Sequence, residues 1–297
     1  MGNLSRRSLL FASGALALAG VACSNDDSKK IPDESIPKNE STETAETTET
    51  TSSELETFTK GKLTIATGEP AYSPWVEDND PASGKGFEAA VAYAVAEKMG
   101  FKKEDVVWVR STFDSAIAPG AKDWDFNLQQ FSITDERRKA VDFSSSYYTT
   151  TQAVVTLEKN ATAKATSLAD LKSVLFGLQS GTVGVKVVKD SVKPEKEPLI
   201  FNNSQDTVQA LKGGQVDAIV VDLPTALYLA AVELKGGKVV GQFPDAGGGE
   251  NFGLVLPKDS KLTPAVTTAV DALREDGTLE KLQKEWLSDS ISVPVLK

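Results

Sequence analysis

The stretch QDTVQALKGGQVDAIVVD, residues 205–222, contains a helix and a strand separated by a tight turn. Residues 205–212 are expected to be helical, and Gly213-Gly214 ends the helix because glycine readily adopts the left-handed conformation that follows one. Residues 216–221, apolar except for Asp217, are typical of a buried strand, and the polar Asp222 follows them directly. This pattern predicts an α/β fold with functional side chains at the carboxyl ends of its strands.

The same alternation extends in both directions along the chain. We expect further strands at 63–67, 106–109, 124–130, 174–178, 198–201 and 252–256. We expect further helices at 86–100, 114–121, 168–172 and 180–190, and two more near the C-terminus, begun by Thr263-Pro264 and capped by Thr278. The two halves repeat one order of elements, which predicts two lobes with a small-molecule site between them.

The composition of the 297 residues restricts the function. Hydrophobic residues make up 40% and charged residues 25%, which is ordinary for a globular protein with a real core. The net charge of −10 argues against nucleic acid as a partner. Histidine is absent, which removes the commonest general base and the commonest zinc ligand, so we expect neither a metal nor another cofactor.

The N-terminus has the features of an export signal. Ser5-Arg6-Arg7 precedes an apolar run, 8–22, that is too short to span a membrane comfortably. Small residues then precede Cys23, and this ending resembles the lipobox of bacterial lipoproteins, although Gly20 stands where leucine is usual. The resemblance implies a signal peptide at 1–22 and a Cys23 that is acylated, for example with palmitate, as a lipid anchor at the extracytoplasmic face of the cell membrane.

Two points about this segment stay open. Residues 5–10 also resemble a twin-arginine export signal, so both export routes are considered. The segment can alternatively be a plain secretory signal peptide with an incidental Cys23, or an uncleaved anchor.

Residues 23–57 differ in composition from the rest of the chain. Serine, threonine and glutamate dominate, so this segment cannot bury enough apolar surface to offset its ordering entropy. It contains ten acidic residues and three lysines, and most of the net charge therefore belongs to it. We expect a lipidated, disordered tether whose acidity says little about a ligand.

A set of short motifs, in one order, carries a family resemblance. From about Lys62 to Trp286 the chain resembles the polar amino-acid-binding branch, family 3, of the solute-binding proteins of bacterial ABC importers. The motifs are Gly86-Phe87-Glu88, Ser132-Ile133-Thr134-Asp135-Glu136-Arg137, Val141-Asp142-Phe143-Ser144, Tyr147-Tyr148, Ser180-Gly181-Thr182, Val216-Asp217-Ala218 with Asp222, and Asp276-Gly277-Thr278 with Lys281-Leu282. Glu88 replaces the aspartate that is usual in the first motif.

The resemblance implies a periplasmic-binding-protein-like fold of type II. Two α/β lobes are joined by a two-stranded hinge. Lobe one comprises 58–152 plus 250–297, and lobe two comprises 153–249. The implied protein is a monomer that binds a free amino acid in the cleft between the lobes, closes around it and docks on the permease of an ABC importer.

A free amino acid carries a carboxylate and an ammonium, and both must stay paired when water is excluded. Arg137 offers a planar fork that can hold the carboxylate bidentately. Thr182 and the amide of Val183 open a helix, where an anion is favoured. Asp222 supplies a carboxylate for the ammonium. The resemblance adds two contacts with the ligand backbone, from the Ser132 hydroxyl and the Gln130 main chain.

Each of these residues also has a structural alternative. Arg137 lies among other charged residues and can belong to a solvated charge run. Ser180-Gly181-Thr182 can be only a turn and a helix cap, and Asp222 can be the cap of the next helix.

The resemblance also places five residues around the ligand side chain: Glu69, Tyr72, Trp75, Phe113 and Gln179. Tyr72 and Phe113 would sandwich that side chain, or belong to the core of lobe one. Glu69 is a carboxylate, and the set contains no obvious extra cation, which disfavours glutamate and aspartate as ligands. Glutamine or another polar neutral amino acid is favoured, and a basic amino acid stays open.

Two other classes of function are considered. An enzyme of the same fold, dehydratase-like, would need an acid or base, for which Glu69 and Glu88 are the candidates. A surface sensor or interaction lipoprotein would have lost transport. We expect a binding protein without catalytic residues.

Overall fold

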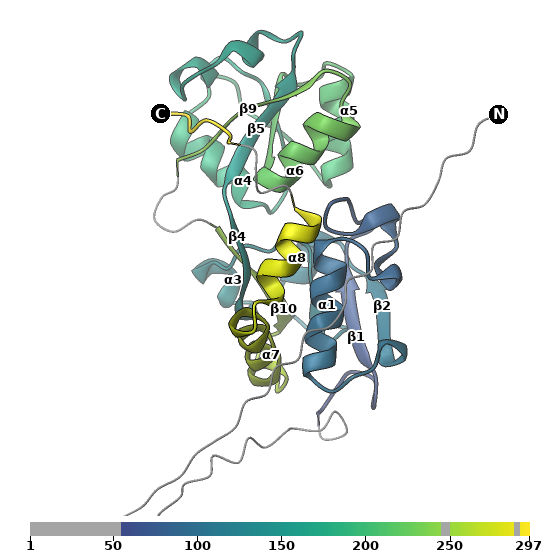
Figure 1. Ribbon diagram of the computed structural model, residues 1–297. Helices are drawn as coiled ribbons and strands as arrows, with labels where there is room; N and C mark the ends of the chain where they lie inside the picture. Colours follow the sequence, from purple (N-terminus) through teal and green to yellow (C-terminus); the bar gives the residue numbers. More distant parts are fainter. Residues whose placement is uncertain (1–54, 245–249, 288–291) are drawn as a thin grey trace, which may run out of the picture. The chain divides into compact units, whose positions relative to one another are not determined.

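The computed structural model describes residues 55–244, 250–287 and 292–297. These residues form two five-stranded sheets, each covered by its own helices (Figure 1). The expected signal peptide, Cys23 and most of the expected tether lie outside the described residues.

The first sheet has the strand order β2-β1-β3-β10-β4. Strands β2, β1 and β3 are parallel, and β10 pairs antiparallel with both β3 and β4. Its strands are β1 (Leu63–Thr67), β2 (Val106–Arg110), β3 (Phe126–Asn127), β4 (Val141–Thr150) and β10 (Glu250–Pro257). The helices of this lobe are α1 (Phe87–Lys98), α2 (Phe113–Ile117), α3 (Asp135–Arg138), α7 (Thr263–Glu275) and α8 (Thr278–Trp286).

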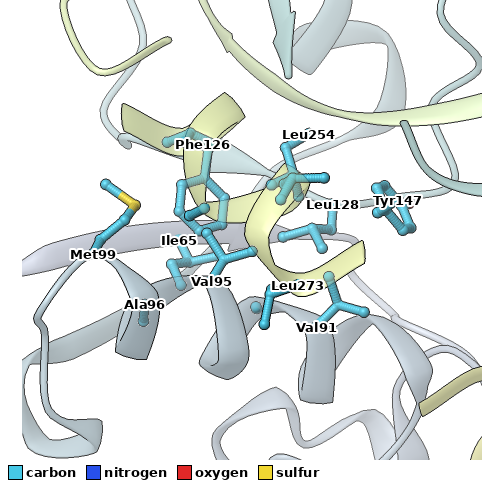
Figure 2. Close-up of a cluster of buried hydrophobic side chains, with 14 of the residues drawn as sticks. Ile65, Val91, Val95, Ala96, Met99, Phe126, Leu128, Tyr147, Leu254 and Leu273 are labelled. Carbon is cyan, nitrogen blue, oxygen red and sulfur yellow. The ribbon is translucent and has the colours of Figure 1, made fainter. Parts of the chain in front are cut away.

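The core of the first lobe explains why α1 forms where the sequence predicts it. Phe87, Val91 and Val95 recur at four-residue spacing and are fully buried. Figure 2 shows Val91 and Val95 in one buried cluster with Ile65 and Phe126 of the sheet. The helix predicted at 86–100 is therefore confirmed as α1, but it is barely amphipathic, because apolar residues such as Ala90 and Ala94 also lie on its outer face.

Gly86 sets the start of α1 close to the loop that precedes it. Its φ of 97° is left-handed, and a Cβ at this position would lie 2.5 Å from the carbonyl oxygen of Trp75. Only glycine permits this approach, which places both Trp75 and Glu88 beside the cleft described below.

The second sheet has the strand order β7-β6-β8-β5-β9. Strand β6 is parallel to β7 and β8, whereas β5 is antiparallel to β8 and β9. Its strands are β5 (Gln152–Leu157), β6 (Phe176–Gln179), β7 (Leu199–Phe201), β8 (Ala218–Asp222) and β9 (Gly237–Gln242). Its helices are α4 (Val183–Val187), α5 (Ser204–Lys212) and α6 (Leu223–Tyr228), and π-helical turns at Val188–Val192 and Leu229–Glu233 extend α4 and α6.

Several predicted elements are shorter than expected. The strand expected at 124–130 is only β3 (Phe126–Asn127); Leu128 stays in the core, and Gln129 and Gln130 line the cleft. The helix expected at 114–121 ends before Pro119. The helix expected at 168–172 is a single 3₁₀ turn, Ala169–Leu171. Thr278 is the first residue of α8 rather than its cap; Gly277, with a φ of 78°, holds the cap position.

Two strand connections carry the chain between the sheets, and residues 292–297, after α8, return to the second sheet. Strand β4 belongs to the first sheet and β5, which follows it directly, to the second. Strand β10 returns to the first sheet after β9. Gln152, expected in lobe one, is therefore the first residue of a strand of the second sheet.

The predicted boundary of lobe one is also wrong at the C-terminus. Val295 pairs with Gln242 of β9, and Leu296 is buried in the core of the second lobe. Leu296 packs over Gly241, where a Cβ would lie 2.7 Å from its side chain. Residues 292–297 thus extend the second sheet. Within the part of the chain that the structure describes, no helix is long and apolar enough to cross a membrane.

Candidate functional site

A cavity of about 530 Å³ lies between the two sheets and takes side chains from both. It is lined by all eleven residues that the sequence predicts to contact a ligand: Glu69, Tyr72, Trp75, Phe113, Gln130, Ser132, Arg137, Gln179, Thr182, Val183 and Asp222. The structure therefore brings the whole predicted set to one place. Their contacts with a ligand stay predictions.

Arg137 is 8% exposed, which excludes the solvated charge run. The Thr134 hydroxyl accepts a hydrogen bond from the Arg137 amide and so begins α3. The guanidinium donates to the main-chain oxygens of Ser132 (2.7 Å) and Gly181 (2.9 Å), which belong to different lobes. It also lies over the ring of Phe113, 5.4 Å from the centroid.

The charge of this guanidinium is not neutralised by a bonded carboxylate, since both its hydrogen-bond acceptors are carbonyls. Burial lowers the pKa of Arg137, and the nearby carboxylates of Glu250 and Asp222 oppose that shift. An arginine remains charged under these conditions. Arg137 can therefore attract an anionic group into the cleft.

Asp222 ends β8 and precedes α6. It occupies the cap position of that helix, but its side chain makes no capping hydrogen bond. Instead Oδ1 accepts a hydrogen bond of 2.6 Å from Nε2 of Gln152, its register partner on β5. Burial raises the pKa of Asp222 well above its usual range, and Glu250 and Glu88 raise it further. A cation in the cleft would lower the pKa of Asp222 and stabilise its carboxylate.

Thr182 precedes α4 and turns its hydroxyl away from that helix. Oγ1 donates to the carbonyl of Gln179 (2.9 Å) and makes no capping bond. Thr182 therefore holds the cap position without a capping side chain, and the alternative of a turn and a helix cap stays open. The first amides of a helix have no partner within it, so the Val183 amide is available as a donor.

Gln130 is held by a buried carboxylate. Its φ of 52° lies in the left-handed region, which is unusual for a residue other than glycine. Glu88 accepts hydrogen bonds from the Gln130 amide (2.8 Å), from the Gln130 side chain and from the Tyr147 hydroxyl. Burial raises the pKa of Glu88 to about 7, against the lowering effect of these three donors.

Glu69 has a cation that the sequence analysis missed. Arg110 Nε lies 3.2 Å from Glu69 Oε2, and Asn79 Nδ2 donates to Oε1 at 3.2 Å. Arg110 also donates to Asn79 and to the carbonyl of Gly68. Glu69 therefore has a neighbouring cation, Arg110, outside the predicted set. The pair forms because Arg110 ends the strand parallel to the one that leads to Glu69, in register with Thr67, and the local sequence pattern does not specify that register.

The three aromatic residues differ in their surroundings. Trp75 is 1% exposed and packs edge-on against Phe87, while its Nε1 donates to Thr225 of the second lobe (2.8 Å). Phe113 lies 4.7 Å from Phe131, centroid to centroid. Burial raises the pKa of Tyr72 to about 12. Trp75 is thus mainly a core residue with one edge on the cleft.

Gln152 and Glu250 were also missed. Gln152 Nε2 donates to Asp222 and to Glu250 Oε2 (3.1 Å), and the Ser132 hydroxyl donates to the same Glu250 oxygen (3.2 Å). Both residues lie where the chain passes between sheets, and no motif marks them. Gln179, at the end of β6, accepts from the Ser204 hydroxyl (2.5 Å).

The polar side chains around the cavity are carboxylates, amides and hydroxyls with one guanidinium, and apolar and aromatic side chains complete the lining. Among residues 55–244, 250–287 and 292–297, no three cysteine or acidic residues are grouped so as to hold a metal ion. The arrangement can hold a small polar molecule with separated positive and negative groups.

Comparison with known proteins gives three findings. The model of the bacterial extracellular solute-binding proteins, family 3, matches residues 63–289. The L-arginine-binding protein of Pseudomonas aeruginosa is 30% identical over 241 residues, which cover 79% of this chain and 91% of that protein. An ancestral arginine-binding protein gives TM-scores of 0.64 both in its arginine-bound structure (31% identity, 77% of this chain, 99% of that one) and in its glutamine-bound structure (32%, 77% and 98%).

Two α/β lobes around a shared polar cleft define a solute-binding protein of the type II periplasmic-binding-protein fold, as the sequence predicts. The chain belongs to the bacterial extracellular solute-binding proteins of family 3.

Proposed function

We propose that this protein binds a free amino acid between its lobes and delivers it to the permease of an ABC importer. One observation carries the proposal: Arg137 of the first lobe and Asp222 of the second line the same cavity. A zwitterion that neutralises both charges binds the closed arrangement better than the open one, and this differential affinity drives closure.

The part of the cleft around Glu69 and Glu233 favours an uncharged ligand side chain. The carboxylate of Glu69 is paired with Arg110, and Glu233, also in the lining, is paired with Lys212 at 2.6 Å. Amide side chains such as Gln129, Gln179 and Asn203 occupy much of the remaining surface. A glutamine-like ligand can exchange hydrogen bonds with amides without needing a free countercharge.

Arginine is the second candidate ligand. The cavity lining contains five carboxylates and one guanidinium, an excess that attracts cations. A relative at 30% identity is named as an L-arginine-binding protein.

Calorimetric titration of the exported domain with L-glutamine and L-arginine tests the proposal. We expect saturable binding without turnover, and a loss of at least about a hundredfold in affinity for Asp222→Asn and Arg137→Ala, since each leaves a buried ligand charge unpaired. Arg138→Ala is the matched control, because Arg138 is exposed and its guanidinium lies against Phe143. Full affinity in both cleft variants would refute the zwitterion clamp.

An enzymatic function is kept as the alternative, because Glu88 is a buried carboxyl in the cleft with a pKa near 7, as a general acid or base requires. Conversion of a bound ligand into product in the same titration would support it. The absence of binding by any amino acid would support a sensor or interaction lipoprotein.

For the location, we propose export by the general secretory or the twin-arginine route, cleavage before Cys23 and acylation of its thiol, with the mature protein acting as a membrane-tethered monomer. The lipobox-like ending of the leader supports this. Metabolic labelling with palmitate should mark the wild type, and Cys23→Ala should abolish the label and release the protein from the membrane.

A further inference from the structure

Glu250 lies where the lobes are joined. It is the first residue of β10 and pairs with Thr150, the last residue of β4. Gln152, two residues further along the chain, begins β5 of the second sheet. Hydrogen bonds between Ile133 and Asn251 (2.7 Å) and between Gly253 and Phe131 (3.0 Å) hold the start of β10 beside the Ser132 loop.

One oxygen of this carboxylate connects both lobes. Glu250 Oε2 accepts from the Ser132 hydroxyl of the first lobe at 3.2 Å and from Gln152 Nε2 of the second at 3.1 Å. Among the described residues, Ser132 and Gln152 line the cavity, and Glu250 does not. Glu250 is therefore placed to act on a ligand through its neighbours.

The hydrogen bond to Glu250 determines whether the Ser132 hydroxyl acts as a donor or as an acceptor toward a ligand. A hydroxyl has one hydrogen, and here it is donated to Glu250, so the serine oxygen can only accept a hydrogen bond from a molecule in the cleft. The Ser132 oxygen can therefore accept a hydrogen bond from a ligand ammonium but has no hydrogen to donate to a ligand carboxylate.

Glu250 also determines the orientation of the Gln152 amide. The Nε2 group lies between two carboxylates, Asp222 and Glu250, and each takes one of its two hydrogens. The reverse orientation would direct an amide oxygen at both acids. Gln152 is thereby fixed as the donor that holds Asp222 in the cleft.

We propose that Glu250 is a positioning residue for the ligand ammonium: it fixes the Ser132 hydroxyl as an acceptor and, through Gln152, holds the Asp222 carboxylate toward the cleft. This inference rests on the proposed amino-acid binding and adds a hinge residue to that site.

The charged groups that face Glu250 are Arg137 on α3 and Asp222 on β8. Burial raises the pKa of Glu250, while Gln152, Ser132 and Arg137 act to lower it. A protonated Glu250 no longer requires a donor from Ser132, and it resembles glutamine in shape and charge. Acidification of the wild type should therefore mimic Glu250→Gln.

Two variants test the role with L-glutamine and L-arginine as probes. Glu250→Gln should weaken the binding of the probe that the wild type takes up by about tenfold to a hundredfold, the effect of losing hydrogen bonds to a buried charged group. Glu250→Asp keeps the charge but shortens the side chain, and should weaken binding by about tenfold because its oxygen no longer reaches both donors. Glu136→Gln, an exposed carboxylate paired with Lys139 next to Arg137, is the control and should bind as the wild type does.

Two readouts separate positioning from a general structural effect. In Ser132→Ala, the further loss caused by Glu250→Gln should be smaller than in the wild type, because the two residues act in one chain of hydrogen bonds. The affinity ratio between wild type and Glu250→Gln should shrink toward one as the pH is lowered through the raised pKa of Glu250, because the protonated side chain then resembles glutamine.

Wild-type affinity in Glu250→Asp, additive losses in the double variant, or a ratio that does not change with pH would each overturn the inference. If the wild type binds neither probe, the proposed function fails first. If the wild type binds a probe and Glu250→Gln binds it equally well, the proposed function stands and only the proposed role of Glu250 is refuted.

Discussion

The two ends of the cleft treat their charges differently. Arg137 donates to two carbonyls and Asp222 accepts from an amide, so neither has a hydrogen-bonded countercharge within the protein and both are available to a ligand. At the other end Arg110 and Glu69 bind each other, and Asn79 holds both. Residues of the same chemical types are thus available to a ligand at one end and neutralised at the other.

This difference has an energetic reason. A buried charge without a countercharge is costly, and the cost is recovered when a ligand supplies the missing partner. A pair that is already neutral offers only hydrogen bonds, and it accepts uncharged groups more readily than ions. The unpaired end is therefore suited to the common part of all amino acids, and the paired end to the part that differs among them.

The largest effect is expected from Arg137→Lys, and Arg110→Lys is its comparison at the paired end. Arg137→Lys should lower amino-acid affinity by at least about a hundredfold, because an ammonium cannot bind two carbonyls and a ligand carboxylate in one plane. Arg110→Lys should cost only a few-fold, since its main partner belongs to the protein. Calorimetry with the preferred ligand measures both, and equal losses would contradict the contrast between the two ends.

Glu88 provides a test of stability at the unpaired end. Its pKa is raised from 4.5 to about 7, so the folded protein holds a proton that the unfolded chain releases. The free energy of unfolding should therefore fall as the pH rises through this window, by about 3 kcal/mol in total from this group. Glu88→Gln should remove that decrease, since its amide can still accept from Tyr147 and the Gln130 amide.

Urea denaturation across the same pH range measures the difference between the variant and the wild type. Glu97→Gln, an exposed carboxylate on the same helix, is the control and should give a curve parallel to the wild type. A constant difference between Glu88→Gln and the wild type from low to neutral pH would show that Glu88 ionises normally.

The sequence predicted the ligand-facing residues better than their partners. Arg137, Thr182 and Asp222 lie in motifs or at strand ends, which are local features of the chain. Arg110 reaches Glu69 through the register of two parallel strands, and Gln152 reaches Asp222 through the register of two antiparallel ones. Such pairings depend on which strands become neighbours, and local periodicity does not specify this.

The fold was also predicted well where local patterns decide it and poorly where contacts between distant segments decide it. Helix α1 and strand β1 follow from an uninterrupted local pattern and were found within two residues of their expected ends. The C-terminal residues 292–297 have no pattern of their own, and their place on β9 depends on the space above Gly241. Strand β3 is short because Gln129 and Gln130, which follow soon after it, line the cleft instead of continuing the sheet.

A modest effect, and the one most specific to the paired end, is expected from Arg110→Met. Removal of the guanidinium leaves Glu69 as a free carboxylate beside the ligand side chain, where a cation would be favoured. The ratio of L-arginine to L-glutamine affinity should rise by about tenfold relative to the wild type, which corresponds to one modest charge–charge interaction. Lys212→Met, which frees Glu233 from a partly exposed ion pair, should raise the ratio less, because water screens that carboxylate. An unchanged ratio in Arg110→Met would mean that Glu69 does not face the ligand side chain, and selectivity would then have to come from the amides and aromatic rings.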